Sequence, residues 1–178
     1  MTQEPGVSRT RTAGHTESVR ASAAGETDVH STSSTLIRAT LIAGCLDLLS
    51  AFVFSGMKGV GPVTVMQGVA SGPFGDGMRD AGLAGAGLGT LVHFSIMTAM
   101  VGVFLLASRR IPWLTAKPVQ AGALYGLVLY GVMYWIVLPM RWPTAFPKTA
   151  WWPVTNALFS HIVCVGIPMA LVIARRAP

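Results

Sequence analysis

Apolar residues in this chain gather in four long runs, each interrupted by only a few polar side chains. A membrane core about 30 Å thick is crossed by about 20 helical residues, and runs of this length and polarity are typical of transmembrane helices. The four predicted spans are residues 36–54, 83–107, 119–140 and 154–174. The pattern therefore predicts an all-α fold, a four-helix transmembrane bundle in contact with the lipid bilayer.

Two stretches outside these runs have a different composition. Residues 1–34 are mostly Ser, Thr, Ala, Gly and charged side chains, which provide little apolar surface to offset the entropy of ordering. We expect them to form a disordered tail before a membrane domain over residues 35–176. Between the first two spans, the Gly-rich residues 59–82 are too interrupted for a fifth span, and residues 61–72 predict a short helix at the membrane interface.

Composition and charge agree with a membrane protein. The chain has 178 residues, of which 52% are hydrophobic and only 11% charged, whereas a soluble domain carries about 25% charged residues. The formal net charge is +6, but the Lys and Arg residues are scattered and form no basic stripe. The sequence therefore does not indicate nucleic-acid binding.

The positions of the basic residues predict an orientation in the membrane. Near the span ends, six lie on one side: Arg38, Arg109, Arg110, Lys117, Arg175 and Arg176. The other side has four: Lys58, Arg79, Arg141 and Lys148. Because cytoplasmic loops carry the excess of Lys and Arg, both termini are predicted to be cytoplasmic. The segment 141–154 is then an outer loop, with Trp142, Trp151 and Trp152 as interfacial anchors.

An aspartate, Asp47, stands in the middle of the first apolar run. With about 3.6 residues per turn, it shares one helix face with small or polar residues: Thr40, Ala43, Gly44, Ser50, Ala51 and Ser55. The opposite face carries large apolar residues: Leu41, Leu48, Leu49, Phe52 and Val53. Small residues let helices approach one another closely, so Asp47 is predicted to point into the bundle.

Two histidines stand at a similar depth, His93 in the second span and His161 in the fourth. An aspartate at the bilayer centre costs about 2.5–3.5 kcal/mol on insertion scales, and intramembrane ionisable residues pair for that reason. We expect Asp47, His93 and His161 to form a buried polar cluster, in which Asp47 pairs with one of the histidines. The cluster has three possible roles: structural hydrogen bonds, proton transfer, or a b-type haem or metal ion held by His93 and His161.

Functional motifs are few. The pairs Gly85/Gly89 and Gly122/Gly126 have the GxxxG spacing of closely packed helices, and they make a homodimer plausible. Neither a Gly-x-Ser-x-Gly elbow nor a His-Glu-x-x-His motif is present. The sequence favours a non-enzymatic membrane protein that handles protons or a small solute through its polar interior. The alternative is a redox subunit that carries haem or a metal.

Several short stretches support a resemblance. They are "LVHF" in the second span, "PWL" after "SRR", "GALYGLVLYGVM" and "VLPM" in the third span, and "NALFSHIVCVGIPMALVIARR" in the fourth. Together they resemble the small bacterial inner-membrane proteins of the YagU-like kind over residues 36–176, although this chain has a shorter first outer loop. The resemblance implies four spans, a bacterial inner membrane and a link to acid tolerance. It supplies no catalytic residue.

Overall fold

The computed structural model describes the backbone of residues 9–176 and the side chains of residues 31–176. The chain divides into two units, residues 1–34 and residues 35–178. Helix α1 (Arg9–Gly56) begins within the first unit, so the backbone of residues 9–34 is helical where composition predicts an irregular tail. Most helical stability in proteins comes from tertiary packing, so a helical backbone alone does not test whether this segment is ordered in solution. Its predicted disorder stays a prediction.

Four helical stretches within the described residues are long and apolar enough to cross a membrane. They are Ser31–Gly56, Gly82–Ser108, Pro118–Arg141 and Trp151–Ala174. Each one contains one of the four predicted apolar runs. The predicted all-α fold with four long apolar helices packed together is confirmed, and the chain is a four-span membrane protein.

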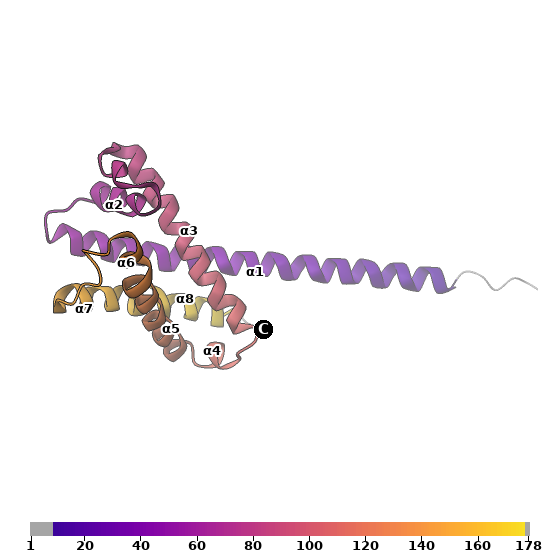
Figure 1. Ribbon diagram of the computed structural model, residues 1–178. Helices are drawn as coiled ribbons and strands as arrows, with labels where there is room; N and C mark the ends of the chain where they lie inside the picture. Colours follow the sequence, from indigo (N-terminus) through magenta and orange to yellow (C-terminus); the bar gives the residue numbers. More distant parts are fainter. Residues whose placement is uncertain (1–8, 177–178) are drawn as a thin grey trace, which may run out of the picture. The chain divides into compact units, whose positions relative to one another are not determined.

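The third and fourth spans are each built from several helical pieces, whereas the second is a single helix (Figure 1). The second span is the single helix α3 (Gly82–Ser108). The third consists of α5 (Pro118–Val132), the π-helical η2 (Met133–Val137) and α6 (Leu138–Arg141). The fourth consists of α7 (Trp151–Phe159), the π-helical η3 (Ser160–Gly166) and α8 (Ile167–Ala174). The connections contain α2 (Pro62–Phe74), the 3₁₀ helix η1 (Asp76–Asp80) and α4 (Trp113–Ala116).

Both π-helical turns end two residues before a proline. Pro139 follows η2 and Pro168 follows η3. A proline has no N–H, so the carbonyl four residues earlier loses its usual helical partner. The sequence predicts this loss at Cys164, within η3. The wider turn changes the register in which side chains leave the fourth span, and η3 is the piece that carries Ser160 and His161.

The first span buries its small face and exposes its large residues. Ala43 is 0% exposed and Ser50 7%, whereas Leu49 is 59% and Val53 53% exposed. In a bilayer, such exposed apolar side chains contact lipid rather than water. The predicted division of this helix into a bundle face and a lipid face is confirmed.

Helix α2 folds back onto α3 at the first glycine pair. A Cβ on Gly85 would lie 2.6 Å from the Met78 carbonyl oxygen, and one on Gly89 would overlap the Met66 carbonyl. The Gln67 side chain also donates to the Gly82 carbonyl at 3.1 Å. A short helix is therefore present where the sequence predicts one, and its placement at the membrane interface stays a prediction.

The second glycine pair brings α5 against the fourth span. A Cβ on Gly122 would lie 2.5 Å from the Gly166 carbonyl oxygen, and one on Gly126 would overlap the His161 carbonyl. Both GxxxG pairs thus pack within one chain. The close packing of these glycines is explained by contacts within one chain, so they no longer support the predicted homodimer.

Candidate functional site

The Asp47 carboxylate lies between three helical segments. Its Oδ2 is 3.9 Å from Nδ1 of His93 on α3. Its other oxygen, Oδ1, accepts a hydrogen bond from the Ser160 hydroxyl on η3. The side chains of His93 and Asp47 are only 9% and 19% exposed. Both carboxylate oxygens are thus engaged by polar groups of other spans, as expected for an ionisable group inside a bundle.

The second nitrogen of His93 fixes the orientation of its ring. Nε2 lies 3.1 Å from the backbone carbonyl oxygen of Gly44, and because a carbonyl only accepts, Nε2 carries the proton. The Phe94 ring packs beside this contact, and a Cβ on Gly44 would lie 2.7 Å from Phe94 Cε1. Gly44 therefore allows α1 and α3 to approach closely enough for His93 to face Asp47.

His161 faces a different set of groups. Its Nδ1 donates to the Ala157 carbonyl at 2.8 Å. Its ring lies edge-on to two tyrosines, with centroid distances of 6.3 Å to Tyr130 and 6.2 Å to Tyr134. The structure thus brings Asp47 and His93 together, while His161 contacts the tyrosines of the third span. A chemical role for any of the three stays a prediction.

Sequence reasoning missed three residues near Asp47. Ser160 binds the carboxylate directly, and Tyr134 and Cys164 lie close enough to interact with its charge. Serines are common in membrane helices, so Ser160 alone gave little signal. Its position beside His161 was the available indication, but the π-helical register decides that Ser160, and not His161, reaches Asp47.

The surroundings of the two histidines give no specific support to a haem or metal site. His93 contacts Gly44 and Asp47, whereas His161 contacts Tyr130 and Tyr134. Among the residues that the structure describes, no group of three or more His, Cys, Asp or Glu side chains is placed to hold a metal ion. The geometry therefore does not favour the haem or metal alternative.

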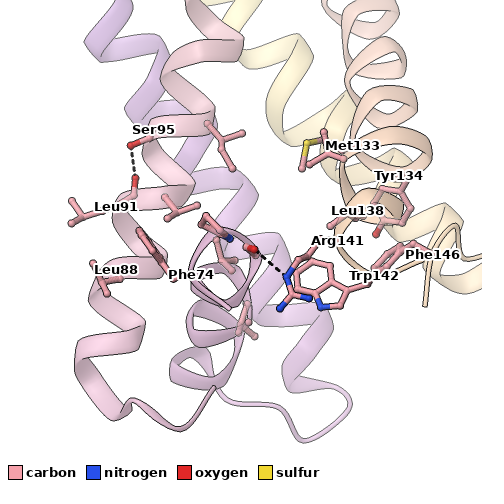
Figure 2. A pocket seen from close by; sticks show the side chains of 18 residues that line it. Phe74, Leu88, Leu91, Ser95, Met133, Tyr134, Leu138, Arg141, Trp142 and Phe146 are labelled. Atoms are coloured by element: carbon pink, nitrogen blue, oxygen red, sulfur yellow. Dashed lines mark hydrogen bonds between the residues drawn. The ribbon is translucent and has the colours of Figure 1, made fainter. Parts of the chain in front are cut away.

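A second feature is a cavity of about 1000 Å³ between the α2–α3 pair and the end of the third span (Figure 2). Apolar side chains line most of it, among them Leu88 and Leu91 on one side and Met133 and Leu138 on the other. Arg141 and Trp142 lie at one end. No pattern in the sequence indicates this cavity, because its walls come from segments far apart in the chain.

An ion-pair cluster includes Arg141, which lines the cavity. Arg141 Nη2 lies 3.0 Å from Asp76 Oδ1, and its Nε donates to the Ser71 and Gly72 carbonyls. The hydrogen bond from Arg141 lowers the pKa of Asp76 below its usual value. Arg79 approaches the same carboxylate at 3.6 Å. The cluster ties the α2–η1 segment to the end of the third span.

No family model, curated protein or solved structure matches this chain. The resemblance to YagU-like proteins therefore stays a prediction, and of what it implies, the four apolar spans are supported by the structure. Function has to be argued from the geometry of the chain itself.

Proposed function

We propose that this four-span membrane protein binds and releases a proton at the Asp47–His93 pair, and handles protons or a small solute coupled to them. The observation that carries the proposal is the position of the Asp47 carboxylate between His93 and Ser160. An ionisable group inside a membrane bundle is expensive, and such groups mark ion paths and proton relays.

The hydrogen bonding of His93 supports the proposal of a proton shared by the pair. Because Nε2–H is used on Gly44, a neutral His93 presents the lone pair of Nδ1 to Asp47. A neutral imidazole facing an ionised carboxylate would set two acceptors against each other. One proton, either on Nδ1 or on Asp47, removes this conflict, so the two groups are expected to share it.

The surroundings of the pair contain few competing charges. Besides His93 and Ser160, Tyr134 of η2 and Cys164 of η3 lie within electrostatic reach of Asp47. Among the described residues, the ion-pair contact of Asp47 is with His93. The imidazole is therefore the group that can balance a negative carboxylate there.

Asp47→Asn is expected to uncouple the titration of His93, because the amide keeps the size and hydrogen bonding of the carboxyl but binds no proton. ¹⁵N NMR of the histidine rings across a pH series measures this, with Asp80→Asn, outside the spans, as the matched control. A His93 titration curve that is the same in Asp47→Asn and in the wild type would contradict the proposal.

We further propose that the protein lies in the cytoplasmic membrane of a bacterium with both termini in the cytoplasm. The excess of Lys and Arg on one side of the spans supports this orientation. Reporters fused after residue 178 and within residues 142–150 are expected to report the cytoplasm and the outside, respectively. An active external reporter at the C-terminus would reverse the assignment.

A further inference from the structure

The cavity beside α2 has the length and lining of an acyl-chain site. On α3 its wall runs from Leu88 to Ile96, which at about 1.5 Å per residue is roughly 12 Å. One leaflet of a hydrocarbon core about 30 Å thick is roughly 15 Å deep. The cavity thus covers most of the depth of one leaflet.

The interior of this cavity offers little to a polar solute. Apart from Tyr134 and the groups at its end, the one hydroxyl in its wall is that of Ser95, which donates to the Leu91 carbonyl at 2.7 Å. A polar solute placed there would leave hydrogen bonds unmade, which is costly away from water. An alkyl chain makes no hydrogen bonds in water and therefore loses none in the same place.

The end of the cavity is positively charged. The Arg141 and Arg79 guanidinium carbons lie 5.1 and 5.9 Å from the centroid of the Trp142 ring. Lys148 Nζ lies 5.3 Å from the ring of Phe146, which lines the cavity. These three cations outnumber the two carboxylates of η1, those of Asp76 and Asp80. An excess of positive charge therefore remains beside the cavity.

We infer that the cavity binds an anionic phospholipid, with one acyl chain between α2, α3 and η2 and its headgroup at Arg79, Arg141 and Lys148. Arginine and lysine at a span end lie at headgroup depth, where basic side chains interact with anionic lipids. This inference does not depend on the role proposed for Asp47, which lies outside the residues that line the cavity.

The test measures which lipid stays bound to the full-length protein. The protein is purified from nanodiscs holding equal amounts of phosphatidylglycerol and phosphatidylcholine, and retained lipid is counted by native mass spectrometry. The wild type is expected to retain phosphatidylglycerol in preference. Lys148→Gln is expected to weaken this preference about fivefold, the effect of one basic residue near a membrane surface. Lys58→Gln, an exposed lysine that does not line the cavity, is the matched control.

A second variant tests the acyl chain. Ser95→Phe places a ring in the cavity, in the space proposed for the acyl chain, whereas Thr98→Phe adds the same ring to α3 outside the lining residues. Thr98 is a close match, since its hydroxyl also donates to the carbonyl four residues earlier at 2.7 Å. Ser95→Phe is expected to lose the retained lipid and Thr98→Phe to keep it. Equal retention of the two lipids by the wild type, or equal retention by the two phenylalanine variants, would overturn the inference.

Discussion

Replacing Gly126 with alanine is expected to lower the free energy of unfolding by about 3 kcal/mol, the upper end of the usual cost of overpacking. The new methyl group would overlap the backbone carbonyl of His161 and lie 2.7 Å from the Ile162 Cα. Backbone atoms have no rotamer into which they can move aside. The helices must therefore separate, and the register that brings Ser160 to Asp47 would change with them.

Gly131→Ala is the matched control for this change. Gly131 lies in the same helix, α5, and a Cβ there would meet no atom within 4 Å. Alanine in a helix is favoured over glycine by about 1 kcal/mol, so this variant is expected to be neutral or slightly stabilised. Reversible unfolding in mixed micelles measures both variants. Equal stability of the two would show that the α5–η3 crossing is looser than its geometry indicates.

The four spans could be predicted from sequence because the bilayer sets one simple requirement. Each helix needs about 20 apolar residues, and nothing else in this chain has that length. Which face of the first span points into the bundle followed from a second rule, since small residues gather where helices touch. Both rules depend on local composition alone, and Ala43 and Leu49 lie on the faces that they predict.

The arrangement of the interior depends on features that composition does not carry. A regular helix over residues 151–174 gives no reason to choose Ser160 over His161 as the group that reaches Asp47. The π-helical η3 before Pro168 makes that choice. The GxxxG pairs were read correctly as close-packing sites, but their partners are segments of the same chain, the backbone of α2 and η1 and the backbone of η3 and α8.

Asp47→Leu is expected to destabilise the bundle by about 1–3 kcal/mol, and Asp47→Asn by much less. The carboxylate accepts a hydrogen bond from Ser160 and lies 3.9 Å from His93 Nδ1. Interhelical hydrogen bonds in membranes average about 0.6 kcal/mol, with a maximum of about 1.7. Leucine removes both interactions and adds bulk to a small-residue face, whereas asparagine can keep them. The insertion cost of the carboxyl does not enter, because the unfolded helices also remain in the bilayer.

A double-mutant cycle of Asp47→Leu with Ser160→Ala isolates one of these interactions. The coupling energy is expected to lie between about 0.6 and about 1.7 kcal/mol, since the Ser160 hydroxyl has Asp47 Oδ1 as its partner in the structure. A coupling near zero would mean that Ser160 does not hold the carboxylate.

Stability also separates a structural role of Asp47 from a chemical one. If Asp47→Asn folds as stably as the wild type but changes the titration curve of His93, the aspartate is required for its proton and not for its hydrogen bonds.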